Sequence, residues 1–206
     1  MTALAETGFG IALIPDKASG DAIFKLHKTL GALLPLVFEL GTDKEPHLTL
    51  LQLYGPNLSQ ALTAVGLLSE TLTTIELEIS GISFVRPAWW FLDVELSSTL
   101  RDIHDKIFHM LAPDLSGPNK IDETKLSHFT PLQRENFLKF GYRFIGNAYN
   151  PHVTLGKSLA HDGMEHKILE ILTAELQNIS STLVFDQLCL FSLGPNGTTE
   201  NVHFKT

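Results

Sequence analysis

The chain contains nearly the same pentapeptide twice, and this repeat limits its possible folds more than any other feature. Residues 46–50 read PHLTL and residues 151–155 read PHVTL. In each copy histidine and threonine are two residues apart, so on an extended strand both point to one side and the apolar residues point to the other. A proline before each histidine suits the first residue of a strand or an edge, where its missing N–H breaks no ladder bond. The repeat predicts two strands that present polar pairs to one shared cleft.

The pattern of apolar residues predicts strands and helices in both halves of the chain. Strands are expected at residues 9–14, 36–40, 47–54, 75–79, 82–85, 89–96, from the second motif onward, and at 182–191 and 202–205. Helices are expected from 19 or 21 to 33, from 59 to 72, from 97 or 98 to 111, from 132 to 140 and from about 164 to 177. The order strand, helix, strand recurs on both sides of the midpoint, which indicates a duplication. Residues 112–150 are the least regular stretch, where a lid or an insertion would lie.

Composition limits the kind of partner that the chain can bind. With 206 residues, 44% of them hydrophobic, it can bury a substantial core as one large domain or two lobes. The net charge of −8 argues against an extended basic groove for nucleic acid, because such grooves need clustered Lys and Arg. A small phosphorylated ligand, or only the end of a nucleic acid, fits this balance.

Cysteine usage and the N-terminal residues indicate the compartment. Cys189 is the single cysteine, so the chain forms no intramolecular disulfide, and its apolar surroundings favour buried packing over reactivity. Residues 1–15 contain no Lys or Arg, which argues against a signal peptide, and the apolar run 33–38 is too short to span a bilayer. We therefore expect a cytoplasmic protein without contact to a membrane.

The two motifs resemble those of the 2H phosphoesterase superfamily, which includes 2′,3′-cyclic nucleotide phosphodiesterases and 2′-5′ RNA ligase-like proteins. Residues 79–84, followed by Pro87, Trp90 and Leu92, are similar to the mid-region strands of that family, and residues 140–150 resemble the approach to its second motif. The resemblance implies one α+β domain over residues 1–206, made of two pseudo-symmetric lobes related by a pseudo-twofold axis. Mainly antiparallel sheets, flanking helices and a central cleft are expected, with no required metal.

The residue types in the motifs fit the chemistry that the family implies. Opening a cyclic phosphodiester needs a base to deprotonate water and an acid to protonate the departing ribose oxygen. Imidazole populates both protonation states near neutral pH, so His47 and His152 are the expected catalytic pair. The hydroxyls of Thr49 and Thr154 lie on the same faces and can donate hydrogen bonds to the phosphate oxygens. The pseudo-symmetry leaves open which histidine is the base.

Five further residues are candidates for substrate contact: Tyr149, Trp89, Trp90, Tyr54 and Arg86. Trp89 and Trp90 lie on opposite faces of their strand, so one can stack on a base while the other packs inside, and core packing of both is the alternative. Tyr54 and Tyr149 flank the motifs. Arg86 can neutralise a phosphate, although an exposed arginine before a proline is also ordinary.

Strict alternation along the motif strands makes a separate prediction. It places Leu51 and Gly156 on the cleft side, where glycine leaves room for a ligand. It places Gln52 and Lys157 on the far face, unless the strand twists or bulges.

The other seven histidines are expected to be structural or surface residues. Three lie on predicted helices, where His104 and His109 border an apolar face and His27 belongs to another helix. The remaining four have no partner at a meaningful spacing; they are His128, His161, His166 and His203. The chain lacks any CxxC, HxH or HExxH pattern, so neither a metal nor another cofactor is expected.

The function predicted from these residues is a metal-independent phosphodiesterase that hydrolyses 2′,3′-cyclic phosphates of nucleotides or RNA ends, or a related 2′-5′ linkage. A non-catalytic module that binds a nucleotide or an RNA end is the alternative from another class. Ligation of RNA through 2′-5′ bonds is a further alternative, which the acidic balance disfavours. A monomer is the default, because the symmetry is already internal to the chain.

Overall fold

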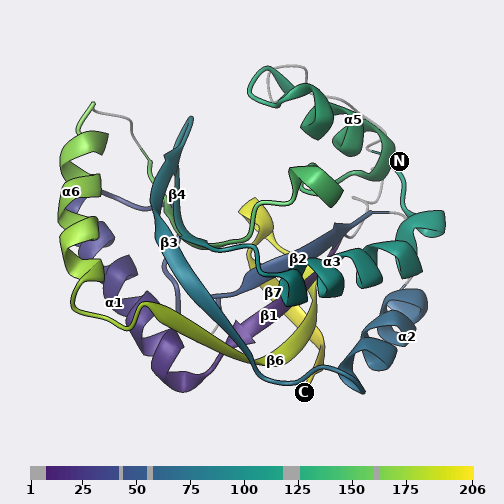
Figure 1. Cartoon of the computed structure of the whole chain (residues 1–206). Coiled ribbons are helices and arrows are strands. Elements are labelled where there is room, and N and C mark those ends of the chain that lie inside the picture. Colours follow the sequence, from purple (N-terminus) through teal and green to yellow (C-terminus); the bar gives the residue numbers. More distant parts are fainter. Residues whose placement is uncertain (1–7, 42–43, 55–57, 118–125, 160–162) are drawn as a thin grey trace.

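The structure is a computed structural model that describes residues 8–41, 44–54, 58–117, 126–159 and 163–206 (Figure 1). Its strands are β1 (Phe9–Pro15), β2 (Leu48–Leu53), β3 (Ile75–Val85), β4 (Trp89–Val94), β5 (His152–Lys157), β6 (Thr182–Leu193) and β7 (Thr199–Lys205). Its α-helices are α1 (Lys17–Leu33), α2 (Leu58–Ser69), α3 (Ser98–Leu111), α5 (Pro131–Phe140) and α6 (Glu165–Leu176). Short 3₁₀ turns are η1 (Ala112–Asp114), η2 (Gly146–Ala148) and η3 (Pro195–Gly197). The predicted combination of helices with antiparallel strands is confirmed.

The order of the elements repeats along the chain. The first half reads β1-α1-β2-α2-β3 and the second reads β4-α3-α5-β5-α6-β6, so α5 is an extra helix of the second half, and β7 is added at the end. The sheet order is β1-β2-β5-β4-β3-β6-β7, and β1 also pairs with β6, so six strands close into a ring. Exchanging β1 with β4, β2 with β5 and β3 with β6 leaves every neighbour relation in this ring unchanged. The topology therefore has the twofold pattern that the repeated motif predicts.

The helices cover the two flanks of the curved sheet. Helices α1 and α6 pack together on one flank, and α2 and α3 pack together on the other (Figure 1). Helix α1 begins after Asp16, whose side chain accepts a hydrogen bond from the Ser19 N–H at 2.8 Å, so Asp16 is the N-cap instead of the predicted Ser19 or Asp21. The side chains of Ile23 and Leu30 on its inner face are fully buried. None of the described helices is long and apolar enough to cross a membrane.

Two predictions of secondary structure are wrong. Residues 36–40 do not form a strand, because the segment after Pro35 makes a single bridge, from Leu36 to Ser158. Residues 75–79 and 82–85 belong to one strand, β3, which pairs with β6 over its first residues and with β4 from Ile79 onward. Gly81 lies at an irregularity in that strand and does not turn the chain back. The remaining elements match their predicted bounds to within a few residues.

Candidate active site

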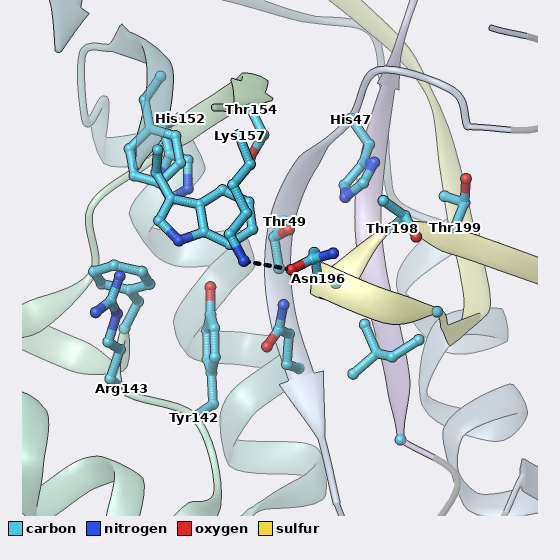
Figure 2. Close-up of a pocket in the computed structure, with 18 of the residues that line it drawn as sticks. His47, Thr49, Tyr142, Arg143, His152, Thr154, Lys157, Asn196, Thr198 and Thr199 are labelled. Carbon is cyan, nitrogen blue, oxygen red and sulfur yellow. Dashed lines mark hydrogen bonds between the residues drawn. The ribbon is translucent and has the colours of Figure 1, made fainter. Parts of the chain in front are cut away.

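The two motif strands lie next to each other and antiparallel, and they pair at Leu48 and Val153. By this register Thr49 lies across from His152, and His47 lies across from Thr154. All four predicted motif side chains line one cavity of about 810 Å³. Figure 2 shows His47 and His152 on opposite sides of this cavity, with Thr49 between them. The structure thus brings the two copies of the repeat into one site.

Each motif histidine is oriented by the backbone two residues before it. His47 Nδ1 lies 3.0 Å from the carbonyl oxygen of Glu45, and His152 Nδ1 lies 2.7 Å from that of Asn150. A carbonyl oxygen only accepts, so Nδ1 is the donor in both rings and Nε2 carries the lone pair in the neutral form. This leaves Nε2 of each ring to exchange a proton with a ligand in the cavity.

The surroundings lower the pKa of both histidines, and the charges that contribute to the two shifts differ. Burial lowers the pKa of His152 from 6.5 to about 4 against the opposing effect of its bond to the Asn150 carbonyl, and the nearby Arg143 and His47 lower that pKa further. Burial also lowers the pKa of His47, but its bond to the Glu45 carbonyl and the Glu45 carboxylate oppose that shift. Both rings are therefore neutral in the free protein at pH 7, and the charges beside them differ, because a carboxylate lies near His47 and a guanidinium near His152.

Aromatic side chains hold the planes of the two rings. Phe91 stacks on His152 with ring centroids 3.9 Å apart, and Phe144 meets the same ring edge-on at 5.6 Å. Phe191 contacts His47 edge-on at 5.1 Å. Gly10 makes room for Phe191, because a Cβ at this position would lie 2.4 Å from the phenyl ring. Ring packing and the Nδ1 hydrogen bonds together define where each Nε2 points.

Both motif strands bulge at the same place. Along β1, Ile11 pairs with Leu51 but Ala12 pairs with Thr49, so Leu50 is an extra residue in β2. Along β4, Trp90 pairs with Gly156 but Phe91 pairs with Thr154, so Leu155 is an extra residue in β5. Leu50 and Leu155 stand at equivalent positions of the repeat, three residues after the histidine. The two strands therefore share a local distortion as well as a sequence.

The bulges overturn the prediction from strict alternation. Leu51 and Gly156 are buried beside the bulged leucines and do not face the cavity. Gln52 and Lys157 line it instead. The reason is that one extra residue reverses the alternation of side chains beyond it. Both polar residues follow the motif threonine by three positions, and this shared spacing was the signal available in the sequence.

Lys157 reaches across the cavity from the second motif strand. Its Nζ donates a hydrogen bond to Oδ1 of Asn196 in η3 at 2.8 Å, and it lies 5.1 Å from the centroid of the Trp89 ring (Figure 2). This contact joins the second motif strand to the turn between β6 and β7. The ammonium group thus lies inside the cavity, where it can bind a negatively charged ligand.

The described lining carries more positive than negative charge, although the whole chain is acidic. Its cations are Lys44, Arg86, Arg143 and Lys157, and its one carboxylate belongs to Glu45. That carboxylate is paired with Lys205, whose Nζ lies 2.9 and 2.7 Å from the two oxygens. Arg143 lies over Phe129 and Phe144, with its Cζ 4.7 and 4.3 Å from the ring centroids. The cavity thus suits an anion.

Of the five further candidates, three line the cavity and two do not. Trp89, Tyr54 and Arg86 are lining residues. Trp90 is 1% exposed and packs in the core, which matches the prediction that the two tryptophans face opposite ways. Tyr149 is 5% exposed, and its hydroxyl donates to the Thr49 carbonyl oxygen at 3.0 Å. Trp90 and Tyr149 therefore pack inside the protein and do not line the cavity, so substrate contact by either remains a prediction that their burial disfavours.

Sequence reasoning missed several lining residues. The main ones are Gln52, His128, Tyr142, Arg143, Lys157 and Asn196. His128, Tyr142 and Arg143 come from the irregular region 112–150, where no periodic pattern shows which side chains turn inward. His161 lies outside the described residues. Among the described residues, no group of three or more His, Cys, Asp or Glu side chains is placed to hold a metal ion.

Comparisons with known proteins give a family and a fold. The family model of the 2′-5′ RNA ligase superfamily matches residues 38–196. The crystal structure of E. coli LigT complexed with 3′-AMP aligns with a TM-score of 0.52 and 12% identity over 98% of each chain. The apo form of E. coli LigT gives the same values, and its complex with ATP gives 0.50 and 10% over 98% of each chain. At this identity the structures establish only the fold. No curated protein sequence matches the chain.

Proposed function

Because the chain belongs to the 2′-5′ RNA ligase superfamily, we propose that it is a metal-independent phosphodiesterase that opens 2′,3′-cyclic phosphates of nucleotides or RNA ends, or cleaves a related 2′-5′ linkage. The observation that supports this most is the matched pair His47 and His152. Each ring donates from Nδ1 to a backbone carbonyl and so keeps Nε2 for the ligand. A threonine hydroxyl accompanies each ring in the same cavity.

The two rings differ in a way that divides the roles of base and acid. Burial lowers the pKa of His152 to about 4 and Arg143 acts in the same direction, so at pH 7 His152 is neutral and accepts the proton of the attacking water. The water oxygen forms a bond to phosphorus, and one P–O bond of the ring breaks. His47 donates its Nε2 proton to the departing ribose oxygen. It acquires that proton because a bound phosphate anion raises the pKa of a nearby imidazole.

The other polar lining residues stabilise charge on the phosphate. The hydroxyls of Thr49 and Thr154 donate to the non-bridging oxygens, whose charge grows in the transition state. The ammonium of Lys157 and the guanidinium of Arg143 balance that charge from the side of His152 (Figure 2). In this arrangement protein side chains supply every positive charge that the reaction needs.

The size of the cavity fits a nucleotide or an RNA end. Its volume of about 810 Å³ lies in the range of roughly 300–1,000 Å³ that is typical of small-molecule sites. Trp89 and Tyr54 offer aromatic surfaces on which a base can stack. E. coli LigT, which shares the fold, has been crystallised with 3′-AMP and with ATP. On these grounds we propose that the cavity of this chain binds ligands of nucleotide size.

The test is a metal-free assay with single-site variants. EDTA-treated protein is incubated at pH 7 with the four nucleoside 2′,3′-cyclic phosphates, and products are followed by phosphorus NMR. Ring opening is expected, and His47→Ala and His152→Ala should each lower kcat by about 10²–10⁴-fold. His166→Ala is the matched control, because this side chain is 90% exposed and lies on α6 outside the cavity lining.

Two outcomes would contradict the proposal. Turnover that stays near the wild-type rate in either alanine variant would remove the two-histidine mechanism. Saturable binding of a nucleoside monophosphate without turnover of any cyclic phosphate or 2′-5′ linkage would instead indicate a binding module.

A further inference from the structure

Two histidines that do not line the cavity occupy equivalent places in the two halves. His27 lies on α1 and His104 on α3, and these helices correspond to each other in the repeated element order. His27 is 2% exposed and His104 is fully buried. The sequence predicts only structural or surface roles for both. Their hydrogen bonds indicate a more specific one.

His104 connects the first motif to the segment that leads into the second. Its Nδ1 lies 2.8 Å from the carbonyl oxygen of Leu50, the bulged residue of β2. Its Nε2 accepts the Gly146 N–H at 3.2 Å, and Gly146 begins η2, six residues before His152. Both bonds require the neutral ring with the proton on Nδ1. Burial keeps the ring in that form by lowering its pKa.

His27 makes the same bonds with the two motifs exchanged. Its Nδ1 lies 2.7 Å from the carbonyl oxygen of Leu155, the bulged residue of β5. Its Nε2 accepts the Leu40 N–H at 3.1 Å, and Leu40 precedes His47 by seven residues. Each histidine therefore joins the bulge of one motif to the approach to the other.

These bonds matter because a bulge removes regular pairing where the motif needs it. The extra residue of a bulge is left without its ladder partner, and a buried carbonyl without any partner costs free energy. Leu50 and Leu155 are both fully buried, so water cannot serve their carbonyls. The imidazole Nδ1 supplies the missing donor in each case. The bulge in turn separates the threonine of the motif from Gln52 or Lys157, so its geometry decides how both reach the cavity.

We infer that His27 and His104 are a matched pair of positioning residues, each of which holds the bulge of one catalytic motif against the segment leading into the other. Neither touches the ligand. They keep the two histidine–threonine pairs in one common geometry across the cavity. The inference rests on the proposed function where its test measures turnover. The hydrogen bonds themselves do not depend on that function.

The hydrogen bonds of His104 are better defined than those of His27. Tyr149 stacks on His104 with ring centroids 3.8 Å apart, and its hydroxyl donates to the Thr49 carbonyl. Two adjacent carbonyls of β2, those of Thr49 and Leu50, therefore bond to this stacked pair of side chains. At His27, the Glu39 carboxylate lies 2.9 Å from the same Nε2 that accepts the Leu40 N–H. That nitrogen cannot donate to Glu39 and accept from Leu40 in one protonation state. We expect larger effects from changes at His104.

The test separates the two bonds of His104 with amide side chains. In His104→Asn the amide nitrogen takes the place of Nδ1 and can still donate to Leu50, whereas in His104→Gln the amide oxygen takes the place of Nε2 and accepts from Gly146. His104→Leu removes both bonds. Because small misplacements of reacting groups cost up to about a hundredfold, His104→Leu should lower kcat by roughly ten- to a hundredfold with a smaller change in KM. Asn should recover most of that loss, and Gln less.

The matched control is Ile107→Ala on the same face of α3, where the side chain is also fully buried. This change lowers the melting temperature, but it should leave kcat within about threefold at temperatures where the protein is folded. A loss of kcat in His104→Leu no larger than in Ile107→Ala would overturn the inference. So would an Asn variant no better than Gln, and this comparison decides the matter if His104→Leu does not fold.

A second readout does not depend on turnover. Inorganic phosphate is titrated into each variant, and the imidazole resonances of His47 and His152 are followed by NMR. His104→Leu should weaken phosphate binding and shift the titration of His47, whereas Ile107→Ala should leave both as in the wild type. If no substrate is turned over by the wild type, the proposed function fails while this titration still decides the positioning role. Unchanged phosphate affinity and His47 titration in His104→Leu would refute it.

Discussion

The two motif strands share their backbone geometry, but the charges around them differ. In both motifs the histidine donates to the carbonyl two residues earlier, and the motif strand bulges three residues after that histidine. A second, buried histidine lies within hydrogen-bond distance of the carbonyl of each bulged leucine. Beyond the bulge the first strand presents neutral Gln52 and the second presents cationic Lys157. The neighbour of His47 is the Glu45 carboxylate, while the neighbour of His152 is the Arg143 guanidinium. The two motifs therefore match in backbone geometry and differ in the charges beside their histidines.

The largest effect expected within this comparison comes from the threonines. Thr49→Val and Thr154→Val remove one donor each while keeping the shape of the side chain. Each should lower kcat by about a hundredfold, because a preorganised donor to the developing charge contributes on that order. Thr63→Val is the control, since this exposed threonine on α2 donates to the Ser59 carbonyl in its own helix and lies outside the cavity lining. A loss in only one of the two motif variants would show that the ligand's phosphate is held by one half alone.

Substitution of Lys157 and of Gln52 should change kcat/KM by different amounts, although the two residues occupy equivalent positions. Lys157→Met removes a charge at the phosphate site and should lower kcat/KM by about tenfold, which corresponds to the loss of a charge-assisted contact. Gln52→Met should change it by less than about threefold, because no charge is lost. Steady-state kinetics of the two methionine variants at one ionic strength measure the contrast. Equal losses would mean that the halves bind the phosphate symmetrically.

The pH dependence of kcat/KM should reflect the pKa values of His47 and His152 in the free enzyme. The base must be neutral, so activity should fall as the pH drops toward the His152 pKa of about 4. The acid must be protonated, and because the pKa of His47 lies below 6.5, activity should also fall as the pH rises above that value. The result is a bell-shaped profile with its maximum on the acidic side of neutrality. An ascending limb above pH 6.5 would contradict this assignment.

A smaller effect is expected on stability. The unfolded chain binds a proton at His152 near pH 6.5, whereas the folded protein binds it only near pH 4, so folding loses stability as the pH falls from about 6.5 to about 4. His152→Phe should reduce the drop in melting temperature between pH 7 and pH 5, and the exposed His166→Ala should leave it unchanged. If both variants retain the full drop, burial of His152 is not its source.

The sequence predicts the elements and the four motif residues because both depend on local patterns. Alternation and helical spacing reveal most strands and helices, and the repeat places the histidines and threonines on matching strands. The positions of Lys157 and Gln52 in the cavity could not be predicted from strict alternation. They depend on the bulges of β5 and β2, which are seen only in the pairing of these strands with β4 and β1. Arg143 and His128 depend on how an irregular segment packs. The bonds of His27 and His104 join residues far apart in the chain, so spacing cannot reveal them.

The most direct test of the division of roles uses a substrate whose leaving group departs without protonation. A nucleotide phosphodiester of 4-nitrophenol has such a leaving group, so its cleavage needs the base but not the acid. We expect His47→Ala to cleave it at close to the wild-type rate, whereas His152→Ala remains impaired to the same degree as with a cyclic phosphate. Recovery in His152→Ala and not in His47→Ala would reverse the assignment, and impairment of neither variant would contradict catalysis by this pair.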